Sequence, residues 1–322
     1  MKKKKNSNTQ LNIDSQLDLY GYEKYFNIFN KLYLKKKLPN TILLSGQKGI
    51  GKSIFANHFT NYLLSLNENN KYDLKNFKIN TNTQVYKLSK NNIHPNLFRV
   101  DSNLKDIGVN EIRNLISFLS KSSNLNNLKI IIIDNIENLN KNSSNALLKV
   151  LEEPKINTYF FLIYDNNKKI LNTIKSRCSE FRINFTKDEK VKIFTNLIKE
   201  YNIDDIDNEI FNLLNFDTPG NLINYIISLG DSYPNISSFE TDYIISCIEK
   251  YENEKDTNLF NTILFLIQNF YYRICLNNIN NLSNYLNNYK KIIDQIHYLK
   301  KFNLNEKSIL KSITNNLYNE QR

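Results

Sequence analysis

The stretch Gly46-Gln47-Lys48-Gly49-Ile50-Gly51-Lys52-Ser53 decides the fold of this 322-residue chain. An apolar run, 41–44, precedes it, and a run with helical spacing, 53–66, follows it. This is the Gly-x-x-x-x-Gly-Lys-Ser pattern of a phosphate-binding loop, in the strand-to-helix setting that the pattern requires. Its glycines let backbone N–H groups turn toward a phosphate, and the helix N-terminus adds partial positive charge. The sequence therefore predicts a nucleotide site.

Each residue of the loop 46–53 is an expected nucleotide contact. We expect Lys52 to reach the outer phosphates and Ser53 to bind the magnesium ion that accompanies them. Asp134 follows the apolar run 130–133, so we expect a buried strand to deliver this carboxylate to the same ion. The alternatives are a chance match at the loop and an Asp134 that only caps its strand.

Apolar runs alternate with helical patterns as far as about residue 183, and then the spacing is helical to the C-terminus. Unbroken apolar strands between helices predict an α/β fold, with a parallel sheet covered by helices on both faces. The expected strands are 41–44, 94–101, 130–133 and 159–164, and the expected helices between them are 20–37, 53–66, 109–119 and 143–151. Residues 67–92, rich in Asn and Lys, are predicted to be an insertion or a long excursion.

The composition narrows the class of protein. The formal net charge is +11, which favours nucleic acid or acidic partners, but the lysines are spread along the chain. A DNA-facing patch and a simple bias in composition therefore both stay open. No apolar stretch has the length of a membrane helix, and the N-terminus does not resemble a secretory signal. The three cysteines have no metal-ligand spacing, so we expect a reduced cytoplasm and no zinc.

The order of the motifs resembles the clamp-loader branch of the AAA+ ATPases, in bacterial DNA polymerase III. Residues 144–154 are similar to that family's Asn-Ala-Leu-Leu-Lys-x-Leu-Glu-Glu-Pro helix, and His94-Pro95 and 108–113 resemble further landmarks. The resemblance covers about residues 20–230. It implies a AAA+ domain over 16–184, a small helical lid over 185–232 and an all-α oligomerisation (collar) domain over 233–322. Residues 1–15, polar and charged, are predicted to be a disordered basic tail.

Ser176-Arg177-Cys178 is the most specific match. In this family the arginine projects across a subunit interface toward the nucleotide of a neighbouring motor subunit. A guanidinium is always charged and presents a planar fork to phosphate oxygens, so it can stabilise the charge of phosphoryl transfer. The resemblance therefore implies that Arg177 acts in trans. The alternative is an ordinary surface salt bridge, worth roughly 0–1 kcal/mol.

Two departures from the family's motor subunits predict binding without hydrolysis. Asn135 stands where hydrolysing members usually carry a glutamate, and an amide cannot accept a proton from water. Glu137 is the nearest acid, but we expect the turn after the strand to point it elsewhere. The lid segment 217–221 also lacks the arginine that senses nucleotide in motor subunits, and a polar water-positioning residue near Asp165 is not evident.

The resemblance as a whole implies a stator, part of the DNA polymerase III holoenzyme, that helps to load the sliding clamp onto primed DNA. Its partners would be motor subunits of the gamma/tau type, a delta-like subunit, the clamp and DNA, with no membrane. ATP or ADP with magnesium would bind without turnover by this chain alone. Three alternatives stay open: an active motor of the same family, a AAA+ factor outside replication, and a degenerate scaffold without a finger.

Overall fold

The structure is a computed structural model that describes residues 16–100, 106–121, 128–203, 206, 208, 210–229, 241–302 and 305–320. The predicted tail, 1–15, and the predicted domain boundary at residue 232 lie outside the described residues. The described residues form two compact units. One contains residues 16–199 and 216–221, and the other contains the rest of the described chain from residue 200 onward.

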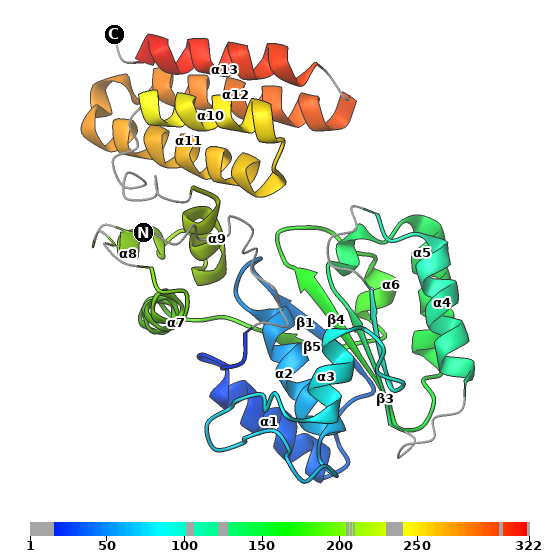
Figure 1. Cartoon of the computed structure of the whole chain (residues 1–322). Helices are drawn as coiled ribbons and strands as arrows, with labels where there is room; N and C mark the ends of the chain where they lie inside the picture. Colours follow the sequence, from blue (N-terminus) through cyan, green and yellow to red (C-terminus); the bar gives the residue numbers. More distant parts are fainter. Residues whose placement is uncertain are drawn as a thin grey trace. The chain divides into compact units, whose positions relative to one another are not determined.

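The first unit is built on a five-stranded parallel sheet with the order β2-β3-β4-β1-β5 (Figure 1). The strands β1 and β3 are buried along their whole length, as strands covered on both faces must be. The predicted α/β fold is confirmed, and the strand order is that of AAA+ domains. The strands are β1 (Thr41–Gly46), β2 (Leu97–Val100), β3 (Lys129–Ile133), β4 (Thr158–Asp165) and β5 (Ser179–Arg182).

Side chains of each strand alternate between two apolar layers, one on each face of the sheet. Ile42 and Leu44 of β1 join the layer that contains α1 (Glu23–Leu34) and α2 (Lys52–Leu64). Leu43, between them, joins the layer that contains α4 (Val109–Ser120) and α5 (Lys141–Glu152). A one-residue slip of β1 would exchange these faces, so the two layers together define the register of the sheet.

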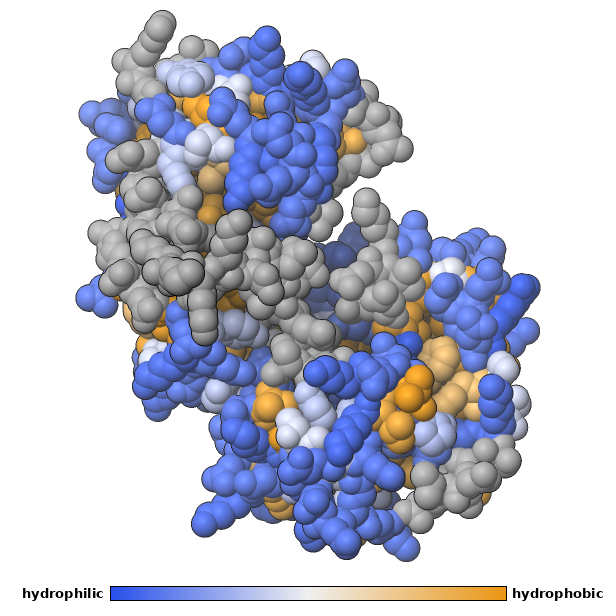
Figure 2. Space-filling model, in the orientation of Figure 1, coloured by the Kyte–Doolittle hydropathy of each residue, from blue (hydrophilic) through white to orange (hydrophobic). Residues whose placement is uncertain are grey.

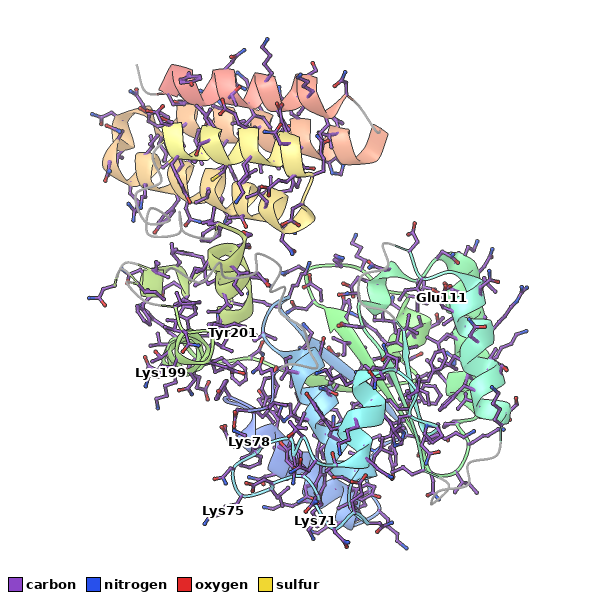
Figure 3. All side chains as sticks on the ribbon, in the orientation of Figure 1. Lys71, Lys75, Lys78, Glu111, Lys199 and Tyr201 are labelled. Carbon is purple, nitrogen blue, oxygen red and sulfur yellow. The ribbon has the colours of Figure 1, made fainter. Side chains whose placement is uncertain are left out.

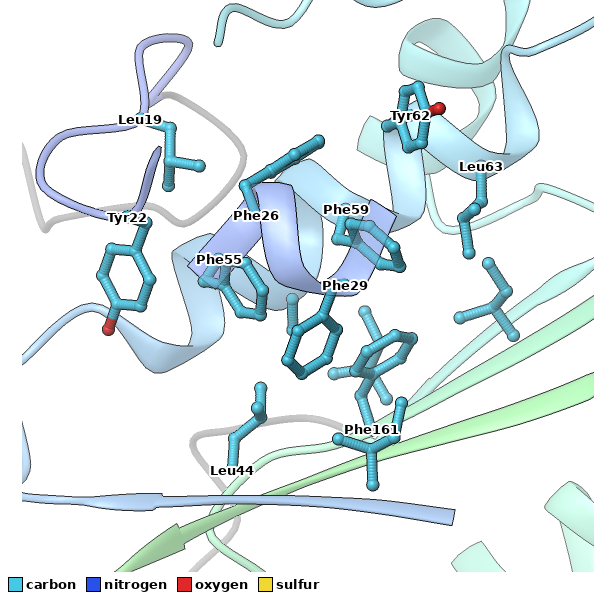
Figure 4. Close-up of a cluster of buried hydrophobic side chains, with 14 of the residues drawn as sticks. Leu19, Tyr22, Phe26, Phe29, Leu44, Phe55, Phe59, Tyr62, Leu63 and Phe161 are labelled. Carbon is cyan, nitrogen blue, oxygen red and sulfur yellow. The ribbon is translucent and has the colours of Figure 1, made fainter. Parts of the chain in front are cut away.

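Phenylalanine rings fill the layer on the α1–α2 face. Phe26 and Phe29 of α1 and Phe55 and Phe59 of α2 are all fully buried (Figure 4). The ring centroids of Phe29 and Phe55 lie 5.0 Å apart and those of Phe26 and Phe59 lie 5.2 Å apart, both edge to face. Such pairs add about 0.5–1.5 kcal/mol each beyond the buried area. They anchor α2, whose N-terminus carries the phosphate loop.

Residues 67–92 fold back onto this aromatic layer. They contain α3 (Gln84–Lys90) and a β-bridge between Asp73 and Lys78, and Tyr72 and Ile79 are buried in the layer itself. Lys71, Lys75 and Lys78 carry charge on the outside of this segment (Figure 3). The stretch that the sequence marks as an excursion is thus a packed part of the first unit, because its few apolar residues reach the core.

The remaining elements of the first unit connect the sheet to its helices. The helices expected at 20–37 and 53–66 are shorter than predicted, since α1 ends at Leu34 and α2 at Leu64. Helix ends are set by capping and solvent rather than by apolar spacing. The first unit also contains η1 (Ile136–Asn138), α6 (Asn172–Lys175) and all but the last residue of α7 (Lys187–Glu200).

The described part of the second unit is helical. Helices α10 to α13 pack against one another in sequence, and α13 also contacts α10. Tyr251 of α10 donates a hydrogen bond to Glu306 of α13 (2.5 Å), and Lys255 pairs with the same carboxylate (2.6 Å). The helices are α8 (Ile210–Leu213), α9 (Pro219–Leu229, whose first three residues belong to the first unit), α10 (Thr241–Glu254), α11 (Thr257–Asn277), η3 (Ile279–Asn281), α12 (Leu282–Phe302) and α13 (Glu306–Glu320).

Hydrophilic residues cover most of the visible face of both units (Figure 2). None of the helices in the described part of the chain combines the length and apolar character needed to cross a membrane.

His58 makes the stability of the first unit depend on pH. Its ring is fully buried in α2, between the Tyr72 hydroxyl (3.0 Å) and the Gln16 carbonyl (3.2 Å), and burial lowers its pKa to about 4. In the unfolded chain, His58 binds a proton near pH 6.5. In the folded protein it binds one only near pH 4. We therefore expect the free energy of unfolding to fall as the pH is lowered from about 6.5 to about 4, by up to about 1.4 kcal/mol per pH unit.

The measurement is chemical denaturation at pH 7, 6, 5 and 4, with a His58→Phe variant as the control. The variant lacks the titrating ring, so the difference in unfolding free energy between the two proteins should change with pH between about 6.5 and 4. A constant difference would show that the protonation of His58 is not linked to folding.

Candidate functional site

The phosphate loop joins β1 to α2 in the geometry that anion binding requires. Gly49 and Gly51 have φ values of 76° and 97°, a region that glycine enters without steric cost. Tyr22 packs on Phe55 with ring centroids 5.2 Å apart, and its hydroxyl donates to the Ile50 carbonyl (3.0 Å). Tyr22 therefore joins the loop to the aromatic layer, and it does so through a loop carbonyl rather than a loop N–H.

Lys52 is held inside the loop that it serves. Its ammonium donates to the carbonyls of Gly46 (2.8 Å) and Gln47 (2.7 Å), which leaves one of its three N–H donors for a ligand. Burial lowers its pKa to about 8, although Asp165, Asp134 and Glu137 act to raise it. Desolvation thus outweighs three carboxylates. A bound phosphate would stabilise the charged form that burial disfavours.

Ser53 and Asp134 meet directly beside Lys52. The Ser53 hydroxyl donates to Oδ2 of Asp134 (2.6 Å), and the backbone N–H of Asn135 donates to Oδ1 (2.9 Å). Burial raises the pKa of Asp134, with the two hydrogen bonds acting against it. A hydroxyl and a desolvated carboxylate are hard oxygen ligands, so this pair fits a magnesium ion that accompanies a nucleotide. The sequence predicted the residues, and the sheet brings them together.

Asp165 is a member of the site that the sequence did not single out. It ends β4, where it stands in register with Gly46 of β1. It is buried, and it is the carboxylate that acts most strongly on Lys52. One signal could have found it: it is the first polar residue after the apolar strand that pairs with the strand of the loop.

Glu137 lies at the site, although the turn after the strand was expected to point it elsewhere. Its side chain is 2% exposed, and its Oε2 accepts a hydrogen bond from the backbone N–H of Asp165 (3.3 Å). Its Oε1 lies 3.3 Å from the ammonium of Lys168. The cause is Asn135, which has φ 52° and ψ 52°, so the chain turns back into η1 and brings Glu137 under the end of β4.

A segment from the start of α9 lies directly on the phosphate loop. The Thr218 hydroxyl donates to the Lys48 carbonyl (2.8 Å), and the N–H of Gly220 donates to the Gly49 carbonyl (3.0 Å). A Cβ added at Gly220 would lie 2.5 Å from that carbonyl oxygen, so only glycine permits the approach. The segment carries no arginine, but it contacts the loop through the Thr218 hydroxyl and the Gly220 N–H.

Arg177 lies at the opposite edge of the sheet from the phosphate loop. It comes just before β5, and its carbonyl accepts a hydrogen bond from the Thr41 hydroxyl (2.7 Å), at the start of β1. Gly46 stands five residues further along β1, which at about 3.3 Å per residue is roughly 17 Å away. An arginine side chain does not span that distance together with the loop beyond it. Arg177 therefore cannot contact a nucleotide in its own chain's loop.

The guanidinium of Arg177 is partly exposed, with 33% of the side chain accessible. Its Nε and Nη2 donate to Oε1 of Glu152 (2.9 and 2.6 Å), and its Nη1 donates to the Thr173 carbonyl (3.0 Å). Cys178, next to it, is a partly buried thiol whose pKa burial raises to about 11, so it carries no nucleophilic thiolate near neutral pH.

A polar cavity of about 260 Å³ lies beside Gly46, between β1, β4 and β5. Lys175 and Arg182 line it, but so does Glu180, whose carboxylate accepts from Ser45 (2.6 Å) and pairs with Arg182 (3.4 Å). The wall therefore carries two cations and one carboxylate, and one of the cations, Arg182, is paired with that carboxylate. In the described part of the chain, no group of three or more His, Cys, Asp or Glu residues could hold a metal ion.

The family model and the curated relatives both point to subunits of DNA polymerase III. The family described as "DNA polymerase III, delta subunit" matches residues 21–187. A DNA polymerase III subunit delta′ from Buchnera aphidicola subsp. Baizongia pistaciae is 30% identical over 290 residues, which cover 87% of this chain and 75% of that protein. A DNA polymerase III subunit gamma from Buchnera aphidicola subsp. Schizaphis graminum is 28% identical over 178 residues, 55% of this chain and 47% of the relative.

A crystal structure of a DNA polymerase III gamma subunit-related protein from Thermotoga maritima matches with 19% identity and a TM-score of 0.48. The match covers 94% of this chain and all of that one. At that score the sheet topology, rather than the superposition, carries the assignment of the fold.

Gly220→Ala tests the contact between the α9 segment and the phosphate loop. The added methyl would lie 2.5 Å from the Gly49 carbonyl oxygen, and overpacking of this kind costs about 1–3 kcal/mol. We expect a lower melting temperature, although alanine by itself favours a helix over glycine. The control is Gly108→Ala, whose methyl would meet only the flexible Glu111 carboxylate at 3.2 Å. Equal melting temperatures for wild type and Gly220→Ala would contradict the contact.

Lys52 predicts a pH-dependent affinity for nucleotide. Its pKa is about 8 without ligand, and only the ammonium form attracts phosphate. The affinity for Mg-ADP should therefore fall as the pH rises above 8, by at most about tenfold per pH unit. Calorimetric titrations at pH 7, 8 and 9 would measure it. Lys52→Arg, which stays charged, is the control, and parallel profiles for the two proteins would exclude Lys52 as the titrating group.

Proposed function

This chain belongs to the DNA polymerase III delta′ family of clamp-loader subunits, and on that premise we propose that it is a stator that supplies Arg177 to a neighbouring subunit's nucleotide. The neighbour is a motor subunit of the gamma/tau type, and the shared task is loading of a sliding clamp onto primed DNA. Membership of this family argues against a AAA+ factor outside replication.

The position of Arg177 at the edge of the sheet away from its own phosphate loop carries this proposal. A partly exposed guanidinium, roughly 17 Å or more from the loop of its own chain, can meet a nucleotide only if another chain brings one. Once there, a charged planar fork would stabilise the negative charge that develops on the transferring phosphoryl group. The backbone of Arg177 is held by the hydrogen bond from the Thr41 hydroxyl to its carbonyl, and the short helix α6 directly precedes it.

We propose that the loop of this chain binds ATP or ADP with magnesium and does not hydrolyse it alone. Lys52, Ser53 and Asp134 provide the cation and the two oxygen ligands that binding needs. Magnesium would shield the phosphate charges and orient the outer phosphate. Asn135 supplies no base, and the segment over the loop, 217–221, supplies no arginine.

An active motor is the second candidate, because Glu137 faces the site. Its carboxylate acts electrostatically on both Lys52 and Asp134. Its Oε2 accepts from the Asp165 N–H, however, and its Oε1 lies 3.3 Å from the Lys168 ammonium, an ion pair without a hydrogen bond. A general base is neutralised when it takes the proton of the attacking water, so Glu137 would lose this ion pair. The ion pair with Lys168 therefore favours the stator over the motor.

The second unit offers a surface for the other subunits. Exposed apolar side chains recur at helical spacing near the junction of α11 and α12, where η3 joins them. Apolar residues that recur on adjacent helices indicate a protein interface rather than scattered surface contacts. We propose that this surface takes part in the collar, with the lid before it. The residues are Tyr272, Leu276, Ile279, Leu282, Leu286 and Ile293.

Arg177→Ala in the reconstituted clamp loader tests the finger. We expect the ATPase rate of the assembled complex to fall by about 10³–10⁵ at the site that this subunit completes, the usual effect of removing a trans arginine. Arg182→Ala is the matched control, because Arg182 is 77% exposed on β5 and pairs only weakly with Glu180. Clamp loading onto primed DNA should follow the ATPase rate.

An unchanged rate for Arg177→Ala in the assembled complex would leave a scaffold without a finger. The isolated chain serves as the companion measurement for the motor candidate. ATPase activity of that chain alone, abolished by Lys52→Ala, would replace the stator with a motor.

A further inference from the structure

We propose that Glu152 is a positioning residue for Arg177, which holds the guanidinium so that two of its N–H groups are presented outward to the neighbour's phosphate. This inference rests on the finger role proposed above. It adds a second residue to that role, on a different helix, and defines the form in which the arginine is offered.

The first step is the count of donors on the guanidinium. An arginine has five N–H groups: one on Nε and two on each terminal nitrogen. Glu152 Oε1 accepts from Nε and Nη2, and the Thr173 carbonyl accepts from Nη1. In the described structure three donors are thus engaged, and one N–H remains on each terminal nitrogen. Those two can form the paired contact that guanidinium makes with phosphate oxygens.

The second step is the rigidity of the supports. Glu152 is the last residue of α5, and its neighbour Leu151 is buried in the apolar layer beneath the sheet. Ile174, three residues before Arg177, is buried in the same layer. Glu152 and Arg177 therefore each lie within three residues of a side chain that is fixed in the core. Thr173 adds a backbone carbonyl that cannot move without α6.

The third step compares what the contact contributes to folding with what it contributes to the reaction rate. Both side chains are partly exposed, 33% for Arg177 and 51% for Glu152, so the ion pair contributes little to folding. A free arginine, in contrast, has many rotamers, and fixing it before the neighbour docks removes that cost from the transition state. A contact of this kind should affect the reaction rate much more than the melting temperature.

The experiment compares Glu152→Ala, Glu152→Gln and Arg177→Ala in the reconstituted clamp loader, with steady-state kcat and KM for ATP as readouts. We expect Glu152→Ala to lower kcat by about 5- to 30-fold with little change in KM, since the released side chain must be ordered again in each turnover. Glu152→Gln keeps an acceptor oxygen and should recover part of the loss. Glu153→Ala, an exposed neighbour at the end of the same helix, is the matched control and should behave as wild type.

The double variant Glu152→Ala/Arg177→Ala separates positioning from other effects. If Glu152 acts through Arg177, its removal should have no further effect once the arginine is gone. A further loss in the double variant would overturn the inference, as would a kcat of Glu152→Ala equal to or above wild type while Arg177→Ala is impaired. Melting temperatures of the isolated variants should agree with wild type, and a large drop for Glu152→Ala would instead assign the residue to folding.

The two proposals fail in different ways. Wild-type rates for Arg177→Ala would remove the finger and the positioning role with it. An impaired Arg177→Ala beside an unimpaired Glu152→Ala would leave the finger intact and remove only the role of Glu152.

Discussion

The parallel register of β3, β4, β1 and β5 is the constraint on which the whole site depends. Parallel strands bring their carboxyl ends to one edge of a sheet. Asp134 after β3, Asp165 at the end of β4 and Gly46 at the end of β1 therefore meet there. The same register puts Arg177, which precedes β5, at the other edge. One topological fact thus gathers the glycine loop and its carboxylates at one edge and separates the arginine from them.

The apolar layers hold that register against the charges gathered at its end. Three carboxylates act on Lys52, and burial still lowers the pKa of the ammonium and raises that of Asp134. A buried group of both signs is costly unless each charge finds a partner. A nucleotide with magnesium supplies both partners at once, a polyanion for Lys52 and a cation for Asp134. Binding is therefore favoured by the same desolvation that makes the empty arrangement costly.

Glu137 and Arg177 differ in how their own chain holds them. The nearest acid after β3, Glu137, accepts from the N–H of Asp165 and pairs with Lys168, so protonation of its carboxylate would break that ion pair. The arginine at the far edge shows the reverse pattern. Its contacts with Glu152 and Thr173 leave donors to spare. In the described structure, Glu137 is thus held by its own chain, whereas Arg177 keeps two N–H groups for a further contact.

The sequence by itself determined the features that local patterns encode. Glycine and lysine spacing defined the loop 46–53, unbroken apolar runs defined the strands, and a short motif identified Arg177, because each depends on neighbours along the chain. Only the tertiary structure decided the roles of Asp165, Glu137, Glu152 and the α9 segment at Gly220. Their partners lie between 25 and 171 residues away, and a left-handed Asn135 reversed the expected direction of Glu137. Such contacts depend on how strands and helices pack, which no local spacing records.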